Sequence, residues 1–336
     1  MTHTAADITT FDAIGEKMND LRSAMGRVIV GQDETIDLLL TALLCRGHVL
    51  VIGVPGLAKT LLVRTLAGAV GLDFSRIQFT PDMMPSDILG TELIQEDAAG
   101  ERHLRFVKGP VFAQLILADE INRTPPKTQS ALLEAMAEHQ VTAAGKTMRL
   151  DEPFVVVATQ NPIEQEGTYP LPEAQLDRFM LALEVDYPSL DEEKQIVADT
   201  PRITQAADEV QRVLNRTTLL AFADAVWRMP VSEHVVDYAV RLARATRPDD
   251  AQAPDMVRQY VGWGAGPRAG QAMVHASKAM AAMAGEPTPS IEHIRRIASA
   301  VLAHRVLTNY AAAGEGLGAG DVVDAVLDAV KPQQYP

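Results

Sequence analysis

Short apolar runs alternate with amphipathic stretches through the first half of the chain. Four of these runs have the length and β-branched content of strands, and they span residues 49–52, 74–79, 115–118 and 154–158. The last two contain uninterrupted apolar positions, as expected for strands that are buried on both faces. Since strands that alternate with helices build a parallel sheet covered by helices, we expect an α/β fold in this half.

The pattern changes after the Tyr-Pro pair at residues 187–188. From there β-branched runs disappear, and Ala-rich stretches with helical periodicity take over. Breaks that contain Gly or Pro divide this part into several helices, and they lie at 247–250, 262–266 and 285–289. We also expect a Gly/Ala-rich loop over 311–320, followed by a short last helix.

The chain therefore divides into two predicted domains. We expect residues 1–188 to form an α/β domain with a parallel sheet and residues 189–336 to form a smaller, all-helical domain. A length of 336 residues, of which 47% are hydrophobic, is enough for two packed cores.

The segment after the first predicted strand carries the clearest chemistry. It reads Gly53, Val54, Pro55, Gly56, Leu57, Ala58, Lys59, Thr60 and Leu61. A loop of the form G-x-x-x-x-G-K-[ST] turns backbone N–H groups toward one anion, and the helix that follows adds its positive N-terminal end. We expect Lys59 to reach the β- and γ-phosphates of a nucleoside triphosphate and Thr60 to bind Mg²⁺. Ala58 stands where this pattern has its second glycine, and a plain strand-to-helix turn is the alternative interpretation.

Two neighbouring carboxylates follow the predicted strand at 115–118. Ligands of open α/β sheets bind at the carboxyl ends of the strands, where Asp119 and Glu120 are expected to lie. Asp119 is suited to hold Mg²⁺, directly or through water, and Glu120 is suited to orient and deprotonate an attacking water. The alternative interpretation is a solvated acidic turn at the end of a strand.

Two polar residues near the end of the first domain extend this candidate site. Asn161 follows the strand at 154–158 and can contact both the γ-phosphate and the attacking water, whereas the alternative is an Asn-Pro turn. Arg178, on a short predicted helix, can reach the γ-phosphate of a neighbouring subunit. Its alternative is an ion pair with Asp177 or Glu173.

Arg268 lies in the second domain, at the start of a predicted helix and directly after Pro267. A cation at that end opposes the helix dipole unless an anion answers it. A triphosphate is one such anion, and an ordinary surface arginine is the alternative interpretation.

The net charge and the cysteine count narrow the classes of partner. A formal charge of −14 disfavours non-specific binding to DNA, RNA or an anionic membrane surface. The one cysteine, Cys45, lies in an apolar helical run, which excludes a disulfide framework and cysteine-based zinc sites. The sequence shows no signal-peptide pattern and no apolar run of about 18 residues, so we expect no membrane insertion and a cytoplasmic location.

These motifs together resemble those of AAA+ ATPases, and more narrowly those of the MoxR group of chaperone-like AAA+ proteins. The strings similar to that group's Walker A, Walker B, sensor 1, arginine-finger and sensor 2 elements are 53–60, 119–123, 158–162, 173–179 and 266–268. An alanine at position 58 is typical of the group. The resemblance implies a P-loop AAA+ domain followed by a helical lid, with ATP and Mg²⁺ as cofactors. It also implies catalytic roles for Glu120, Asn161, Arg178 and Arg268.

The resemblance further implies that Ile29, Val30 and Gly31 lie near the adenine. Residues 104–112 resemble the group's helix-2 insertion, and residues 141–148, which independently read as a hairpin with a Gly-containing turn, match the hairpin before sensor 1. Such hairpins point into the pore of a ring, so they are candidate contacts to a protein client. Two plain surface hairpins are the alternative.

The implied function is Mg²⁺-dependent ATP hydrolysis at the subunit interfaces of a homo-oligomeric ring, expected to be a hexamer, that remodels or activates partner proteins. Family members commonly work with von Willebrand factor A-domain proteins, and the sequence has no D-x-S-x-S motif, so such a partner is expected to be a separate chain.

Three other functions stay open at this point. They are a nucleotide-gated scaffold with little turnover, a chelatase-type motor subunit for metal insertion, and a DNA-directed motor. The pair Asp119 and Glu120 argues against a pure scaffold, since a binder has no need of a water-activating carboxylate. No helix-turn-helix or zinc module is visible for a DNA-directed motor.

Overall fold

The structure is a computed structural model that describes residues 5–96, 102–162 and 167–332. Its first part, up to the last strand of the main sheet, contains α1 (Ala5–Gly26), α2 (Asp33–Leu44), β1 (Val49–Gly53), α3 (Lys59–Val70), β2 (Phe74–Gln78), α4 (Pro85–Leu89), β3 (Gly90–Glu96), β4 (Arg102–Lys108), η1 (Pro110–Phe112), β5 (Leu115–Asp119), η2 (Ile121–Arg123), α5 (Pro126–Glu138), β6 (Gln140–Ala143), β7 (Lys146–Arg149), β8 (Val155–Gln160), α6 (Glu173–Leu176) and β9 (Leu181–Val185). Its second part contains α7 (Leu190–Ala198), α8 (Thr200–Asp208), α9 (Arg216–Arg228), α10 (Glu233–Ala245), α11 (Asp255–Tyr260), β10 (Val261–Trp263), α12 (Pro267–Met283), α13 (Ile291–Leu302), η3 (Ala303–Arg305), β11 (Leu307–Thr308), α14 (Tyr310–Glu315) and α15 (Ala319–Ala329).

Five strands form the main sheet, in the order β2-β5-β8-β1-β9, and every neighbouring pair is parallel. This confirms the predicted α/β fold. The four predicted strands are present, and the sequence analysis missed the fifth, β9, at the edge next to β1. Its sequence, Leu-Ala-Leu-Glu-Val, has only one β-branched residue, so packing against β1 rather than intrinsic propensity explains why it is extended.

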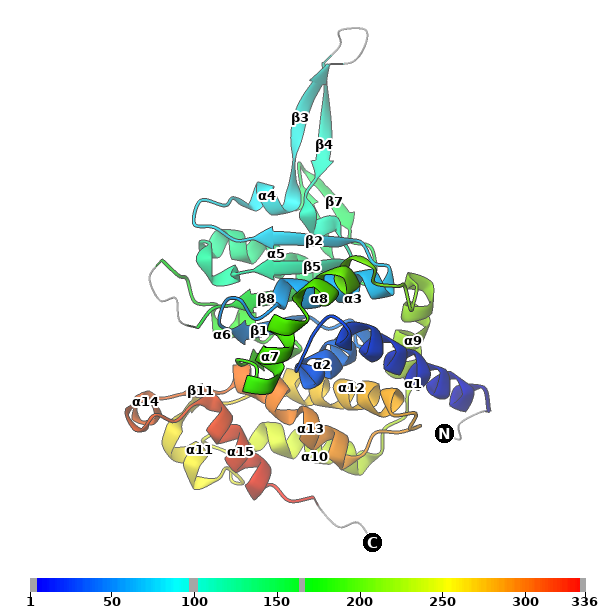
Figure 1. Cartoon of the computed structure of the whole chain (residues 1–336). Helices are drawn as coiled ribbons and strands as arrows, with labels where there is room; N and C mark the ends of the chain where they lie inside the picture. The colour runs from blue at the N-terminus through cyan, green and yellow to red at the C-terminus, as the bar shows by residue number, and fades with distance from the viewer. Residues whose placement is uncertain (1–4, 97–101, 163–166, 333–336) are drawn as a thin grey trace.

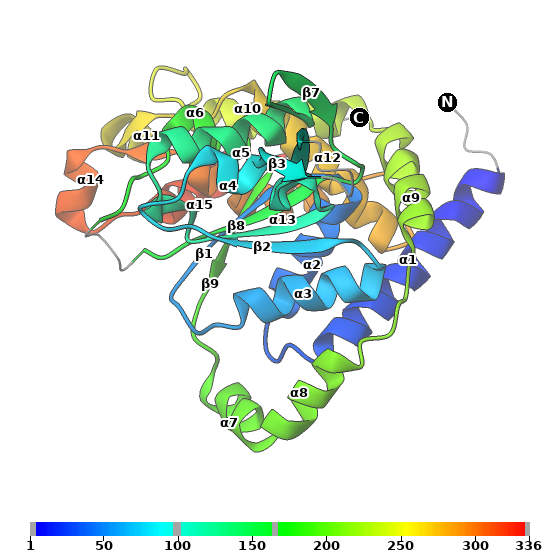
Figure 2. The ribbon, with the colours of Figure 1, turned by 90° about the horizontal axis from the view of Figure 1, so that it is seen from above.

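Alternate residues of the central strands enter two different cores. In β5, Leu115 and Leu117 pack in a cluster with α1, α2 and α3, whereas Ile116 and Ala118 pack in a second cluster with α5. Figure 2 shows α3 and α5 on opposite faces of the sheet. Both faces are therefore covered, which explains the uninterrupted apolar runs.

Helices dominate the second part. Figure 1 shows α10 to α15 below the main sheet. Two short strands, β10 and β11, pair antiparallel within it. The predicted boundary at residue 188 stays a prediction, and β9 leaves the sheet three residues before it, at Val185. The larger core cluster is continuous across both parts, because Leu21 of α1 and Met273 of α12 belong to it. The two parts therefore share one core.

The expected loop over 311–320 is wrong. Most of it is helical, since α14 ends at Glu315 and α15 begins at Ala319. Asn309 caps α14 by accepting hydrogen bonds from the backbone N–H groups of the two residues that follow Tyr310, and alanines continue the turn. Gly316 then ends the helix in the left-handed region, with φ +72°. Gly316 thus ends α14 and Gly318 precedes the first residue of α15, whereas Gly314 and Gly320 lie within the two helices.

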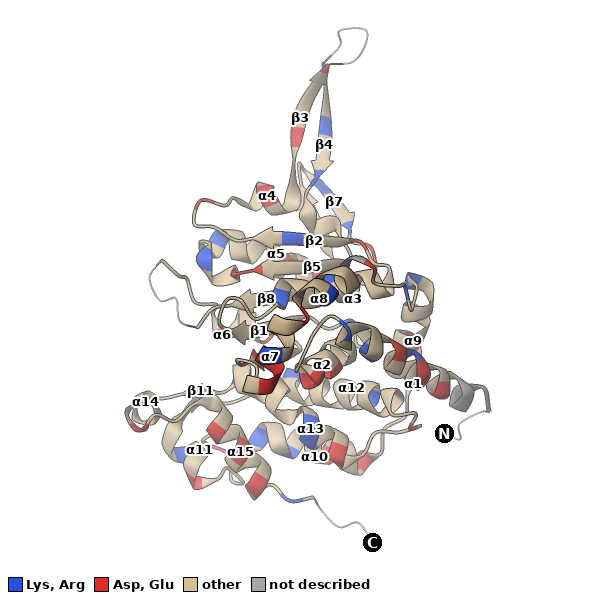
Figure 3. Cartoon of the chain, viewed as in Figure 1, with Lys and Arg blue, Asp and Glu red and all other residues tan. Residues whose placement is uncertain are grey.

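The structure contains two antiparallel hairpins near the segments that the resemblance singled out: residues 141–148 lie within β6–β7, whereas residues 104–112 cover only the second half of β4 and η1. The β3–β4 hairpin extends beyond the sheet on the side away from the helical part (Figure 1), and the β6–β7 hairpin follows α5. Ile94 and Leu104 are cross-strand partners on the first hairpin, and they are 70% and 67% exposed. Figure 3 shows acidic and basic residues interspersed along both parts of the chain. No described helix has the length and apolarity needed to cross a membrane.

Candidate functional site

The loop between β1 and α3 is the centre of the candidate site. β1 ends at Gly53, and α3 begins at Lys59, so the residues between them form a turn at the carboxyl edge of the sheet. The Nζ atom of Lys59 donates a hydrogen bond to the carbonyl oxygen of Gly53 at 2.6 Å. Burial lowers the pKa of Lys59, and the carboxylates of Asp119 and Glu120 act in the opposite direction.

Two residues of this loop show why the sequence has its pattern. A Cβ atom at Gly53 would lie 2.6 Å from the carbonyl oxygen of Val185, so the close approach of β9 requires glycine there. Ala58 adopts φ +55°, a left-handed conformation that costs an L-residue roughly 1 kcal/mol. The position that departs from the two-glycine pattern therefore keeps the backbone conformation that glycine favours.

A cavity of about 410 Å³ lies beside this loop. The predicted residues that line it are Pro55, Gly56, Ala58, Lys59, Thr60, Leu61, Asp119, Glu120 and Asn161. These side chains come from the ends of three parallel strands and the start of α3, which meet at one edge of the sheet. We call this space the phosphate-side cavity. The structure thus brings the predicted lysine, hydroxyl, carboxylates and amide together.

Asp119 is held by residues from the two strands that flank β5. The hydroxyl of Thr159 donates to Oδ1 of Asp119 at 2.7 Å. Arg76 of β2 donates to Oδ2 through Nη2 at 2.7 Å and through Nε at 3.1 Å. The carboxylate is 13% exposed. Sequence reasoning missed Thr159 and Arg76, although Arg76 follows the two-residue alternation of a strand that it had identified.

Glu120 adopts a left-handed backbone, with φ +57°, directly after β5. Its N–H group donates to the hydroxyl of Thr159 at 2.8 Å, which fixes this turn. Its Oε2 atom accepts hydrogen bonds from Gln78 at 2.8 Å and from Arg123 at 2.9 Å. A non-glycine residue in this region is uncommon and typical of functional turns. Gln78 and Arg123 were also missed by sequence reasoning.

Thr60 and Asp119 offer the oxygen donors that Mg²⁺ prefers. A hydroxyl and a carboxylate both line the phosphate-side cavity, and hard oxygen ligands of this kind usually bind Mg²⁺ together with water and substrate phosphates. The donor set therefore fits the ion. Because Arg76 makes two hydrogen bonds to Asp119, a bound ion would compete with this guanidinium for the carboxylate.

A second cavity of about 310 Å³ lies on the other side of the loop. Ile29, Val30 and Gly31, which the resemblance predicts to lie near the adenine, line it, and Leu57 lines it from the loop. Ala58 and Leu61 border both cavities. A mainly apolar space joined to a phosphate-sized one suits a base and its phosphates. Gly53 and Val54 are outside both linings.

The two predicted arginines lie elsewhere. Arg178 comes two residues after the end of α6, rather than on that short helix as expected, and its Nη1 atom donates to the carbonyl oxygen of Leu133. Within the described residues it forms no ion pair with Asp177 or Glu173. Neither Arg178 nor Arg268 lines the two cavities beside the loop.

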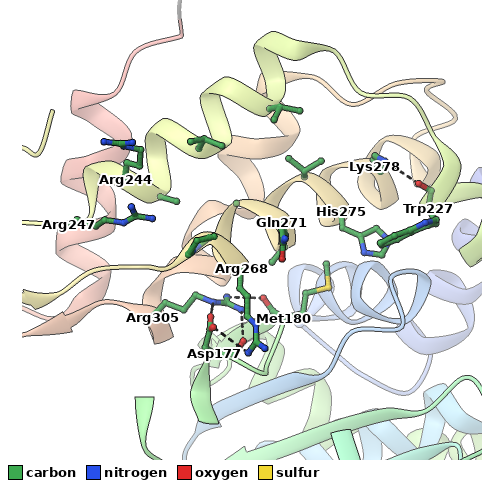
Figure 4. Close-up of a pocket in the computed structure, with 17 residues that line it drawn as sticks. Asp177, Met180, Trp227, Arg244, Arg247, Arg268, Gln271, His275, Lys278 and Arg305 are labelled. Carbon is green, nitrogen blue, oxygen red and sulfur yellow. Dashed lines mark hydrogen bonds and ion pairs between the residues drawn. The ribbon is translucent and has the colours of Figure 1, made fainter. Parts of the chain in front are cut away.

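Arg268 is the second residue of α12, which begins at Pro267 as predicted. The anion that answers it in the structure is the carboxylate of Asp177, since Nη1 of Arg268 lies 3.6 Å from Oδ2. Arg305 reaches the same carboxylate, with Nε 2.8 Å from Oδ1 (Figure 4). Asp177 thus binds Arg268 and Arg305, and Arg178 follows it directly in the sequence; we refer to these three arginines as the arginine cluster. Arg268 and Arg305 border a cavity of about 1080 Å³ on the helical part.

Comparison with known proteins places the chain in a family. Residues 48–181 match the model of the ATPase family associated with various cellular activities (AAA), and residues 254–326 match the AAA lid domain. Chaperone MoxR1 of Mycobacterium tuberculosis is 42% identical over 304 residues, covering 90% of this chain and 79% of that protein. Protein MoxR of Paracoccus denitrificans is 33% identical, covering 86% and 88%.

A solved structure agrees with this placement. The crystal structure of a protein from Cytophaga hutchinsonii, described as a candidate ATPase, matches with a TM-score of 0.89 and 39% identity. The match covers 97% of this chain and 98% of the other. The parallel sheet with its helical lid is therefore shared over nearly the whole length.

Proposed function

Because the chain belongs to the MoxR-type AAA+ ATPases, we propose that it hydrolyses ATP with Mg²⁺ at interfaces between its own copies and uses this cycle to remodel or activate a protein partner. One observation carries the proposal. The groups that bind phosphate and activate water share one cavity, whereas the predicted arginines lie outside it. In this proposal, the phosphate-side cavity of one subunit is completed by arginines of a neighbouring subunit.

The main polar groups of the phosphate-side cavity have separate roles in this proposal. The backbone of the loop binds the phosphates, and Lys59 exchanges its bond to Gly53 for the β- and γ-phosphates. Mg²⁺, when bound, supplies positive charge to the phosphate oxygens. Glu120 orients the attacking water and accepts its proton, and Asn161 positions the same water against the γ-phosphate. Thr159 keeps the turn that aims Glu120.

The arginines are proposed to act on a neighbour's nucleotide. Arg268 is ion-paired with Asp177, the residue directly before Arg178, so the two arginines are linked through this carboxylate. A guanidinium at the γ-phosphate stabilises charge in the transition state, and hydrolysis then depends on assembly. We propose a closed homo-oligomeric ring, with six subunits as the number that the family resemblance implies.

The client contact is proposed for the two hairpins. Ile94 on β3 and Leu104 on β4 are cross-strand partners, and both side chains are exposed. Adjacent apolar side chains in contact with solvent are typical of a protein-binding surface. A relative named Chaperone MoxR1 supports a protein as the target. We propose that a von Willebrand factor A-domain protein, if it takes part, is a separate chain.

Steady-state ATP hydrolysis as a function of protein concentration tests the proposal, with Mg²⁺ or with excess chelator. Specific activity should rise with concentration, disappear with chelator, and be absent in Lys59→Ala, whose loop cannot hold the phosphates. Specific activity that stays constant over a range in which the assembly dissociates to monomers would argue for a site complete within one subunit. Nucleotide binding without turnover at every protein concentration would favour the alternative function, a nucleotide-gated scaffold.

A further inference from the structure

Arg305 is a lid residue whose side chain is only 4% exposed and whose guanidinium enters the segment that carries Arg178. Its Nε atom donates to Oδ1 of Asp177 at 2.8 Å. Its Nη2 atom donates to the carbonyl oxygen of Phe179 at 2.6 Å, and its Nη1 atom donates to that of Met180 at 3.2 Å. One side chain therefore binds the residues on both sides of Arg178.

A buried guanidinium is costly unless its N–H groups are satisfied. Besides the three bonds above, Arg305 donates to the carbonyl oxygen of Val301 in α13, the helix directly before η3. Asp177 supplies the neutralising charge, and Figure 4 shows Arg305 and Arg268 converging on it from the lid. The planar, five-donor shape of arginine suits this set of acceptors, and lysine lacks it.

The neighbouring His304 reinforces the same contact. Its Nε2 atom lies 3.0 Å from the carbonyl oxygen of Phe179. Burial lowers the pKa of His304 to about 3, so the ring is neutral near pH 7 and can donate one hydrogen bond to this carbonyl. The lid thus holds the segment from two consecutive residues.

The other side of the segment is held by the sheet domain. Arg178 itself donates to the carbonyl oxygen of Leu133 in α5, and the N–H group of Met180 donates to the carbonyl oxygen of His48 before β1. The segment is consequently bound between the lid and the sheet. A shift of the lid would pull on the backbone at both neighbours of Arg178.

We propose that Arg305 is a positioning residue that sets the placement of Arg178, so that the orientation of the lid controls the arginine offered to the next subunit. This inference rests on the proposed function, in which Arg178 acts across the interface. Arg305 itself touches no nucleotide in this arrangement. Its effect passes through the carboxylate of Asp177 and the backbone carbonyl of Phe179.

A merely structural role, as one of several contacts that hold the lid, is the competing explanation. Arg296 of α13 offers a matched control, because it also joins the lid to the first part of the chain. Its Nη2 atom lies 3.1 Å from Oδ2 of Asp37 in α2, and it forms no hydrogen bond or ion pair with the described residues 177–180. Arg296→Met removes a bond between the two parts without touching Asp177.

The test compares Arg305→Met with Arg296→Met in kcat, in affinity for a fluorescent ATP analogue and in assembly state. We expect kcat to fall about 10- to 100-fold in Arg305→Met, the cost of displacing a group by around 1 Å, with analogue affinity and assembly unchanged. Arg296→Met should retain at least half of the wild-type kcat. Equal losses in the two variants would overturn the inference.

Mixed assemblies separate positioning from damage to the fold. Arg305→Met subunits keep an intact nucleotide loop, and Lys59→Ala subunits keep an intact Arg178. Mixing the two should therefore restore a large part of the lost activity, whereas a variant whose own nucleotide site is damaged would show no such recovery. If Arg305→Met does not fold, Arg305→Lys replaces it, with a smaller loss of kcat and the same recovery expected.

Arg178→Ala is run in parallel to keep the two proposals apart. If neither variant recovers on mixing with Lys59→Ala, the action of Arg178 across the interface is wrong. If Arg178→Ala recovers and the Arg305 variants do not, the positioning role alone is wrong.

Discussion

The phosphate-side cavity and the arginine cluster differ in charge and in what holds them. The cavity contains two adjacent carboxylates, Asp119 and Glu120, whereas in the cluster two arginines bind one carboxylate, Asp177, and the third, Arg178, follows that residue in the sequence. Residues of one sheet and the loop joined to it build the first region, while the second draws on both the sheet domain and the lid. The cavity is thus rigid by construction, and the cluster depends on how the lid sits.

This difference teaches where control of the proposed reaction can reside. β8 pairs with both β1 and β5, the strands that precede Lys59 and Glu120, so we expect a lid movement to have little influence on either residue. The same movement acts directly on Asp177, which is bonded to Arg268 and Arg305 of the lid. ATP binding is therefore expected to depend on the phosphate-side cavity alone, whereas ATP turnover is expected to depend on both the cavity and the arginine cluster.

Glu120→Gln tests the cavity and should have the largest effect. The amide keeps the shape but cannot accept a proton, so kcat should fall about 10³-fold or more while the affinity for ATP is retained. Turnover assays and binding of a fluorescent ATP analogue measure the two quantities. Glu134→Gln, an exposed change of the same type on α5, is the control and should behave as wild type. Undiminished turnover in Glu120→Gln would remove this residue as the base.

Arg178→Ala tests the cluster and should have the next largest effect. Removal of a guanidinium that stabilises transition-state charge should lower kcat about 10³-fold, with ATP affinity nearly unchanged. Recovery on mixing with Lys59→Ala subunits would place its action on a neighbour's nucleotide. Arg228→Ala, at an exposed position near the end of α9, controls for the loss of a positive charge. A large loss of ATP affinity in Arg178→Ala would instead put this arginine at its own nucleotide.

The contrast between the regions also explains what the sequence could predict. Lys59, Thr60, Asp119 and Glu120 follow apolar strands at fixed offsets, and parallel strands deliver their ends to one edge, so local pattern was enough to group them. Arg76 and Gln78 alternate on β2 and could have been included by the same reasoning. Their partners became visible only through the pairing of β2 with β5.

No local pattern predicts that Arg305 and Arg268 meet at Asp177. Arg305 lies 128 residues from Asp177 along the chain, in a short helical turn whose sequence gives no sign of a buried cation. Burial of an arginine depends on acceptors that the packed structure provides, and here these are backbone carbonyls of another element. Local pattern also misjudged residues 311–320, where the capping role of Asn309 decided the outcome.

Arg76→Gln sharpens the description of the cavity, with a moderate effect. Arg76 pairs with Asp119 while its own side chain is 47% exposed, so the pair contributes about 1 kcal/mol or less. Its removal should free Asp119 and lower the Mg²⁺ concentration that half-saturates hydrolysis by up to about fivefold. Titration of activity with Mg²⁺ at constant ATP measures this value, and Arg76→Lys, which keeps the charge, should change it less. A higher half-saturating concentration would show that Arg76 assists nucleotide binding rather than competing with the ion.

Ala58→Gly should have the smallest effect and tests how rigid the cavity is. Ala58 adopts φ +55°, and glycine relieves the left-handed strain at the cost of a more disordered unfolded chain, so the free energy of unfolding should rise by about 0.5–1 kcal/mol. Ala144 provides a matched control, because it has φ +52° in the β6–β7 turn, away from both cavities. Urea unfolding should show similar gains for Ala58→Gly and Ala144→Gly. Only the change at position 58 should weaken ATP affinity, because a freer loop loses entropy on closing around phosphate, and equal affinities in both variants would mean that Ala58 contributes nothing to the preorganisation of the loop.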